Sequence, residues 1–160
     1  MRHYMVDRIV EFRRGERAVG VKAISLSDEV FNEHFPGNPV YPGVYLLEGL
    51  AQTGGLLLER STGGERFALM VSVDRARFTA FARPGDLVSL TVDVESLEPA
   101  LARVRGSAAV GGRTIASARI TFRLLPYEQV MPADALPFWE RAKAIWAGEF
   151  PAPPAPADDA

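Results

Sequence analysis

Residues 42–60 are apolar on nearly every side of the helix that they would form. Their large and small apolar side chains are Val44, Leu46, Leu47, Leu50, Ala51, Leu56, Leu57 and Leu58. A helix that is hydrophobic all round is buried, whereas a surface helix shows a single apolar stripe. Gly49, Gly54 and Gly55 disfavour a helix, so we expect them where its backbone approaches a neighbouring element closely. The rest of the domain therefore has to enclose this helix.

Six other segments alternate apolar and polar residues, as strands do when one face is buried. They span residues 5–12, 17–27, 67–78, 87–97, 101–110 and 113–125. Short connections rich in turn residues, such as Arg-Pro-Gly-Asp at 83–86, make neighbouring strands antiparallel. The sequence predicts an α+β domain at residues 1–126, in which an antiparallel sheet of about six strands curls around one long central helix.

Two segments follow this domain. Residues 127–149 have the pattern of a short C-terminal helix that contains Trp139 and Trp146, which we expect to pack on the core or on another subunit. Residues 150–160 are rich in proline and alanine, end in acidic residues and are predicted to be disordered.

Composition and charge exclude several classes of protein. The 18 basic and 20 acidic residues give a formal net charge of −2, whereas a nucleic-acid-binding protein is usually basic. With no cysteine and only 2 histidines, we expect no metal site, and without a phosphate-binding glycine loop we expect no cofactor. No apolar stretch is long enough to span a membrane. Charges at Asp7 and Arg8 interrupt any signal peptide, so we expect a cytoplasmic protein.

A stiff loop leads into the apolar helix and carries His34. Three prolines within residues 36–42 restrict the backbone between this histidine and the helix. Glu48 follows about two turns into the helix, with no lysine or arginine close in sequence, and a buried carboxylate needs a partner. Gln52 lies one turn further on the same face, where we expect it to hydrogen-bond to Glu48.

Each of these residues also has a structural interpretation. An isolated glutamate in such a helix could reach the surface or pair with a distant arginine, and an isolated loop histidine is most often solvated. The joint setting of His34 and Glu48 favours a functional site, because a core does not require a rigid loop that holds a histidine before a helix. His3 is more readily structural than catalytic.

The stretch from His34 to Gln52 resembles the signature of the FabZ-type 3-hydroxyacyl-[acyl carrier protein] dehydratases. The matching residues are His34, Phe35, Pro36, Gly37, Pro39, Pro42, Gly43, Val44, Glu48, Ala51 and Gln52. Residues 4–12 and 73–92 are similar to two further stretches of that family, so the resemblance covers about residues 4–125. It implies the hotdog fold, and it implies dehydration of (3R)-3-hydroxyacyl-ACP to trans-2-enoyl-ACP in fatty acid or related polyketide or polyene biosynthesis.

Such a dehydration removes a weakly acidic proton from C2 and a hydroxyl group from C3. It needs a base, an acid and a donor to the developing enolate oxygen. A neutral His34 suits the base, and Glu48 in a dry site suits the acid. The N–H of Gly43 or Val44, in the unsatisfied first helical turn, can donate to the oxygen.

The resemblance also implies an acyl tunnel beside the helix. We expect Phe35, Leu47, Phe78 and Phe81 to line it, although each fits the core equally well. Tyr41 stands where many relatives have methionine or phenylalanine, so the resemblance leaves the chain-length preference open. Tyr41 and Gln52 belong to the predicted substrate site. Glu48 rather than aspartate favours the FabZ-type enzyme over its FabA-type relative, which also isomerises the double bond.

In the family, the histidine of one subunit is completed by the carboxylate of another. This implies a homodimer with His34 facing Glu48 across the interface, and often a trimer of dimers. The implied partner is acyl carrier protein, which is acidic; Arg75, Arg77 and Arg83 are candidate contacts, and we expect at least one of them to serve the fold. The alternatives are a hotdog thioesterase, an enoyl-CoA hydratase, and a non-catalytic hotdog subunit.

Overall fold

The computed structural model describes residues 4–146 and 148. Within these residues the elements are, in chain order, β1 (Arg8–Arg13), β2 (Arg17–Ala23), the 3-10 helix η1 (Glu29–Asn32), α1 (Gly43–Ser61), β3 (Arg66–Phe78), β4 (Leu87–Leu97), β5 (Leu101–Val110), β6 (Arg113–Pro126), the 3-10 helix η2 (Tyr127–Gln129) and α2 (Leu136–Trp146). His3 and residues 150–160 lie outside the described part, so the predictions made for them stay predictions.

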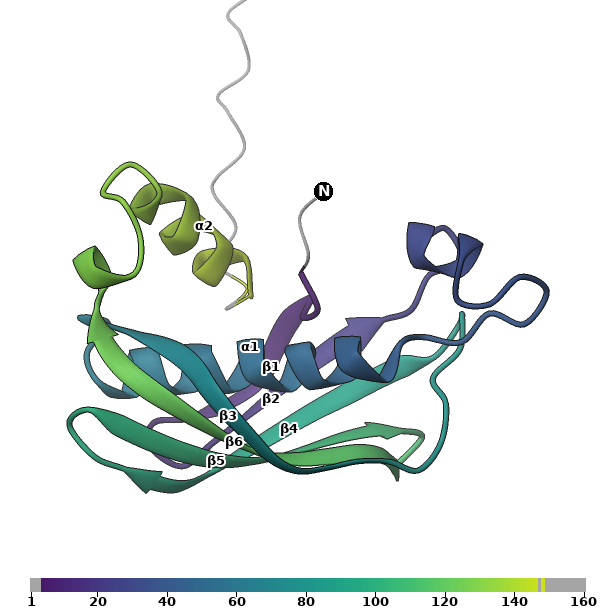
Figure 1. The fold of residues 1–160 in the computed structure, drawn as a ribbon, viewed down its shortest axis with the longest axis horizontal. Helices are drawn as coiled ribbons and strands as arrows, with labels where there is room; N and C mark the ends of the chain where they lie inside the picture. Colours follow the sequence, from purple (N-terminus) through teal and green to yellow (C-terminus); the bar gives the residue numbers. More distant parts are fainter. Residues whose placement is uncertain (1–3, 147, 149–160) are drawn as a thin grey trace, which may run out of the picture.

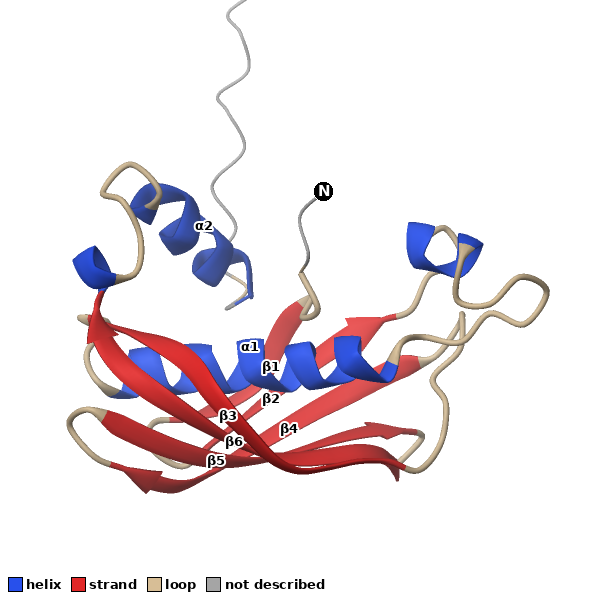
Figure 2. Cartoon of the chain, viewed as in Figure 1, coloured by secondary structure: helices blue, strands red, loops and turns tan. Residues whose placement is uncertain are grey.

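The strands form one antiparallel sheet in the order β1-β2-β4-β5-β6-β3, and α1 lies across its concave face (Figure 1). Figure 2 shows the strands in red curving beneath this helix. Leu50, Leu57 and Leu58 of α1 are fully buried, together with Val92, Val104 and Ile120 of the sheet. The predicted α+β class and the curled sheet around one long helix are confirmed.

Two strands are shorter than their apolar patterns. β1 begins at Arg8 rather than at residue 5, because the Met5 N–H donates to Oε1 of Gln52 on α1 at 2.9 Å instead of joining the sheet. β2 ends at Ala23, because residues 25–28 close a turn through side-chain hydrogen bonds to the backbone. Serine and aspartate side chains offer the backbone this alternative to a sheet ladder.

Gly49 allows α1 to approach its neighbours closely. A Cβ atom there would lie 2.9 Å from Leu90 Cδ1 and 3.0 Å from the Met5 carbonyl oxygen. At Gly54 a Cβ atom would meet Val104 at 3.4 Å, and at Gly55 its nearest neighbour would be Ala68 at 4.0 Å, both ordinary contacts. The predicted close approach therefore holds at Gly49 and is wrong for the other two glycines.

The substitution Gly49→Ala is expected to lower the free energy of unfolding by about 1–3 kcal/mol, because overpacking outweighs a gain of up to ~1 kcal/mol in helix propensity. Gly54→Ala is the matched control, since it gains the same propensity where a Cβ atom has room. Urea unfolding of both variants measures the difference, and equal destabilisation of the two would contradict the argument.

α2 packs over the C-terminal half of α1, on the side away from the sheet (Figure 1). Trp146 is only 2% exposed and belongs to the main hydrophobic cluster, and Trp139 packs against that cluster. Of the two environments expected for these tryptophans, the structure thus shows packing on the core.

The described residues contain neither a membrane span nor a metal cluster. No helix within them has the length and apolarity needed to cross a membrane. No three histidine, aspartate or glutamate side chains of the described part come together as metal ligands would.

Candidate active site

The loop between η1 and α1 is a closed turn that presents His34. The Phe35 N–H donates to the Asn38 carbonyl oxygen, and the Asn38 N–H donates to the Phe35 carbonyl oxygen, with N to O distances of 3.2 and 2.9 Å. Gly37 has a φ of 75°, which a type II turn requires at its third position. The peptide bond from His34 to Phe35 is cis, and the Val40 N–H donates to the His34 carbonyl oxygen at 3.0 Å. The His34 N–H donates to the Val30 carbonyl oxygen at 2.9 Å, so hydrogen bonds hold the backbone of His34 on both sides.

The His34 ring has a defined tautomer. Its Nδ1 lies 2.7 Å from the carbonyl oxygen of Val40. A carbonyl oxygen only accepts hydrogen bonds, so Nδ1 carries the proton and the neutral ring keeps its lone pair on Nε2. The half-buried imidazole also stacks on the Phe35 ring, with centroids 4.1 Å apart. Nε2 is thus the ring atom that can accept a proton.

Arg83 supports the same loop. Its Nη1 donates to Asn38 Oδ1 at 2.9 Å and to the Pro39 carbonyl oxygen at 3.3 Å. Of the three arginines suggested as carrier-protein contacts, this one therefore serves the fold. Arg75 and Arg77 lie exposed on β3.

Glu48 is oriented by a chain of two hydrogen bonds. Its Oε1 accepts from Nε2 of Gln52 at 3.0 Å, as expected from their spacing, and Oε1 of Gln52 accepts from the Met5 N–H at 2.9 Å. A backbone N–H only donates, so the amide oxygen of Gln52 has to face Met5 and its nitrogen has to face Glu48. Among the described residues, Oε2 of Glu48 makes no hydrogen bond, so it is available to exchange a proton.

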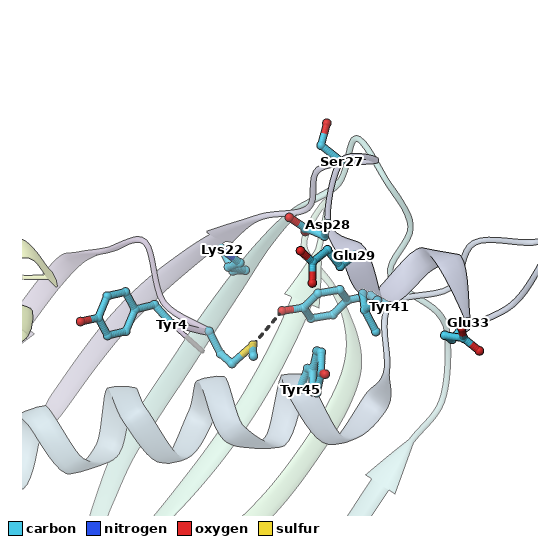
Figure 3. Close-up of a pocket in the computed structure, with 10 residues that line it drawn as sticks. Tyr4, Lys22, Ser27, Asp28, Glu29, Glu33, Tyr41 and Tyr45 are labelled. Carbon is cyan, nitrogen blue, oxygen red and sulfur yellow. Dashed lines mark hydrogen bonds between the residues drawn. The ribbon is translucent and has the colours of Figure 1, made fainter. Parts of the chain in front are cut away.

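Tyr41 connects the loop to the same N-terminal segment. Its hydroxyl donates to Sδ of Met5 at 3.1 Å, the contact drawn as a dashed line in Figure 3. Burial, followed by the nearby carboxylates of Asp28 and Asp7, raises the pKa of Tyr41 well above its usual value, so the hydroxyl remains a donor. Met5 is therefore held between the loop and α1.

A cleft of about 580 Å³ opens beside Tyr41 (Figure 3). The rings of Tyr4, Tyr41 and Tyr45 contribute to its wall, and Lys22, which pairs with Asp7 at 2.8 Å, contributes a cation. Neither His34 nor Glu48 lines this cleft. Within the described residues, no hydrogen bond joins the side chains of His34 and Glu48, which bond instead to Val40 and Gln52.

The start of α1 offers two backbone donors. Pro42 is the N-cap residue, and its carbonyl oxygen accepts the Tyr45 N–H at 2.9 Å. In the described part of the chain, the N–H groups of Gly43 and Val44 have no backbone acceptor. A helix N-terminus carries partial positive charge, so these groups suit a developing oxyanion. A Cβ atom at Gly43 would lie 2.8 Å from the Phe78 ring, so the tight contact favours glycine there.

Apolar side chains near the start of α1 are exposed rather than buried. Phe35, Val44, Phe78 and Phe81 are between 51% and 68% exposed. The alternative that Phe35, Phe78 and Phe81 are core residues is therefore wrong. Leu47, in contrast, does pack against the core. Large exposed apolar patches mark contacts with partners or ligands.

Glu59 is a buried charge that the sequence reasoning missed. It is 1% exposed and accepts hydrogen bonds from Ala68 N–H at 3.2 Å, the Tyr127 hydroxyl at 2.7 Å and Trp139 Nε1 at 3.2 Å. Nζ of Lys143 lies 3.4 Å from the same carboxylate. This group of residues, the Glu59 cluster, joins α1 to α2. Its one sequence signal is a second carboxylate in an apolar helix, about three turns after Glu48.

Tyr127 and Lys143 of the Glu59 cluster bind their protons tightly. Burial raises the pKa of Tyr127 to about 12. Burial lowers the pKa of Lys143, but its hydrogen bonds to Glu140 and Tyr127 and the charge of Glu59 outweigh this, so its pKa is raised overall. Groups whose pKa is higher in the folded state stabilise it below their unfolded pKa, and this contribution is lost as pH rises through the folded value.

The free energy of unfolding is therefore expected to fall between pH 10 and pH 12. For Tyr127 the loss is about 1–2 kcal/mol after allowance for solvent screening. Thermal unfolding across this range, compared with Tyr127→Phe, measures it. The variant should show a smaller decline than the wild type, and an equal decline would contradict the assignment.

The chain is similar in sequence to known proteins of one family. A family model described as a FabA-like domain matches residues 2–119. The 3-hydroxyacyl-[acyl-carrier-protein] dehydratase FabZ of Caldanaerobacter subterraneus subsp. tengcongensis is 38% identical over 121 residues, which are 74% of this chain and 84% of that protein. The protein of the same name from Bacillus velezensis is 38% identical over 121 residues, 75% of this chain and 86% of that protein.

Solved structures share the fold at lower identity. A hot-dog-like protein from Thermanaerovibrio acidaminovorans gives a TM-score of 0.62 at 22% identity, over 81% of this chain and 93% of that chain. A hypothetical thioesterase protein with coenzyme A from Streptococcus pneumoniae gives a TM-score of 0.62 at 13% identity, over 74% of this chain and 85% of that chain. These likenesses concern the fold alone, and they confirm the predicted hotdog fold.

Proposed function

The chain belongs to the FabA-like family, and from this we infer that it is a 3-hydroxyacyl-[acyl carrier protein] dehydratase of fatty acid biosynthesis. The observation that carries the inference is the identity to FabZ dehydratases over most of the chain. The presence of His34 and Glu48 supports it, because a protein that only binds acyl chains has no chemical need for an acid and a base.

We propose the following roles in the reaction. Nε2 of His34 removes the C2 proton, and the electron pair moves onto the thioester oxygen. The N–H of Gly43 or Val44 donates to that oxygen, and one such donor typically lowers a barrier by about 3 kcal/mol. The electron pair then forms the C2–C3 double bond while the C3–O bond breaks and Oε2 of Glu48 protonates the leaving hydroxyl, which departs as water. Gln52 keeps Glu48 in position.

We also propose a homodimer that completes each site. β3 is an edge strand of the described sheet, and it exposes Leu69, Met70 and Val71 besides Phe78. A long apolar edge strand favours pairing with another strand. Pairing of two β3 edges would cover this surface and bring a second chain close to α1. The molar mass in solution, by light scattering, distinguishes a dimer from a trimer of dimers, and a stable monomer would contradict the proposal.

For the carrier protein we propose Arg75 and Arg77 as contacts, since both are exposed and acyl carrier protein is acidic. The double variant Arg75→Glu/Arg77→Glu is expected to lower kcat/KM about 10-fold or more for carrier-bound substrate, because charge reversal slows association. Turnover of a pantetheine thioester, which lacks the carrier, is the control and is expected to be unchanged. Equal losses on both substrates would instead place these arginines in the fold or the dimer.

Product analysis tests the function itself. We expect a cytoplasmic enzyme that converts 3-hydroxyacyl thioesters on acyl carrier protein to the trans-2-enoyl product without release of free thiol. A thioesterase would release thiol, an enoyl-CoA hydratase would prefer coenzyme A thioesters, and a non-catalytic subunit would give neither product. Failure to form enoyl product across several chain lengths would overturn the inference.

A further inference from the structure

We propose that helix α2 is a positioning element for Glu48. It acts through Trp146, the N-terminal segment Tyr4–Met5, and Gln52, which together set the orientation of the Glu48 carboxyl group. The inference rests on the proposed dehydration. The family match ends at residue 119, within β6, so α2 lies beyond the part of the chain that it covers.

α2 is fixed to α1 rather than loosely attached. Lys143 and Trp139 of α2 both reach the carboxylate of Glu59, and Lys143 also donates to the Tyr127 hydroxyl at 2.7 Å. Phe67 of β3 packs on the Trp139 ring, with centroids 5.4 Å apart. These contacts place the C-terminal end of α2 at a defined position above the middle of α1.

That end of α2 contacts the N-terminal segment. The Trp146 ring is nearly perpendicular to the rings of Tyr4 and Trp139, and its centroid lies 5.4 Å and 5.6 Å from theirs. In Figure 1 the coloured part of the chain just before β1 lies near the C-terminal end of α2. Among the described residues, the buried Nε1 of Trp146 has no hydrogen-bond partner, whereas its ring packs on the rings of Tyr4 and Trp139.

Met5 transmits this contact to the carboxyl group. Its N–H fixes the amide of Gln52, its side chain accepts the Tyr41 hydroxyl, and its carbonyl oxygen lies against Gly49. If Tyr4 lost its ring partner, Met5 could shift and its N–H could leave Gln52. Loss of that hydrogen bond would weaken the orientation of the Gln52 amide, and with it the position of the Glu48 carboxyl group that the amide holds.

The test compares three α2 variants in carrier-bound 3-hydroxyacyl turnover. Trp146→Ala is expected to lower kcat about 10- to 100-fold with little change in KM, because the acid is misplaced while substrate binding persists. Trp146→Phe, which keeps a ring against Tyr4, is expected to restore most of the activity. Phe138→Ala is the matched control on the same helix, because this side chain is 70% exposed, and it is expected to behave as the wild type.

A double-mutant cycle separates positioning from general destabilisation. In a Gln52→Ala background, Trp146→Ala is expected to cause little further loss, since Trp146 acts on Glu48 through Gln52. Additive losses, or full activity of Trp146→Ala, would overturn the inference. Urea unfolding confirms that each variant is folded at the assay temperature. If Trp146→Ala is not folded, the kcat of Trp146→Phe decides the question. An inactive wild type would instead overturn the proposed function.

Discussion

Loss of the His34 or the Glu48 side chain is expected to lower enoyl formation by about 10²–10⁴-fold, the usual contribution of a general acid or base. A mixture of His34→Ala and Glu48→Ala, unfolded and refolded together, is expected to recover about a quarter of the wild-type rate, because half of the dimers are mixed and each has one intact site of two. This follows from a site shared between subunits, in which one chain supplies the base and its partner supplies the acid.

The measurement is turnover on carrier-bound substrate for each variant alone and for the mixture. Glu98→Ala, which removes an exposed carboxylate in the β4–β5 turn, is the control for handling and is expected to keep full activity. Two inactive variants without recovery after mixing would show that each site belongs to one chain, and an active His34→Ala variant would exclude this histidine as the base.

Disruption of the Glu59 cluster is expected to have the largest effect on stability. Lys143→Ala removes the cation beside a carboxylate that is 1% exposed, and breaking a buried ion pair typically costs about 3–5 kcal/mol, since the remaining charge is uncompensated. The double variant Glu59→Gln/Lys143→Met removes both charges and is expected to be more stable than Lys143→Ala. Chemical unfolding of the two variants and the wild type measures these differences.

Glu140→Ala is the matched control for this pair. Nζ of Lys143 also lies 2.6 Å from Glu140, but that carboxylate is largely exposed, so its removal is expected to cost less than about 1 kcal/mol. Equal destabilisation by Lys143→Ala and Glu140→Ala would mean that Glu59 does not depend on its buried partner. Because α2 also contacts Tyr4, the variant Lys143→Ala is further expected to lower kcat.

Much of the fold could be predicted because its signals are local. Alternation with a period of two marks strands, and an apolar run without alternation marks the buried helix. The predicted helix at residues 42–60 corresponds to Gly43–Ser61, and four of the six strands agree closely with their apolar patterns. The hydrogen bond from Gln52 to Glu48 could be predicted for the same reason, since it depends only on helical spacing.

The parts that could not be predicted depend on distant partners. Met5 is 47 residues from Gln52, and no local pattern indicates that its N–H leaves the sheet for an amide on α1. Glu59 is 80 residues from Trp139, and the sequence does not show that an extension folds back to bury it. In the sequence, Arg83 likewise looks like an ordinary surface arginine. It supports the loop only because the fold places Asn38 within hydrogen-bond distance of it.

Local patterns in the chain were enough to predict the layered fold, the rigid loop that carries His34 and the placement of Glu48 one helical turn before Gln52, because dihedral restriction and residue periodicity act over a few residues. Three features could be known only from the folded chain: the tautomer of the His34 ring, the orientation of the Gln52 amide and the burial of Glu59. Each of these depends on which donor or acceptor a distant segment brings within hydrogen-bond distance, and chain folding alone sets that distance.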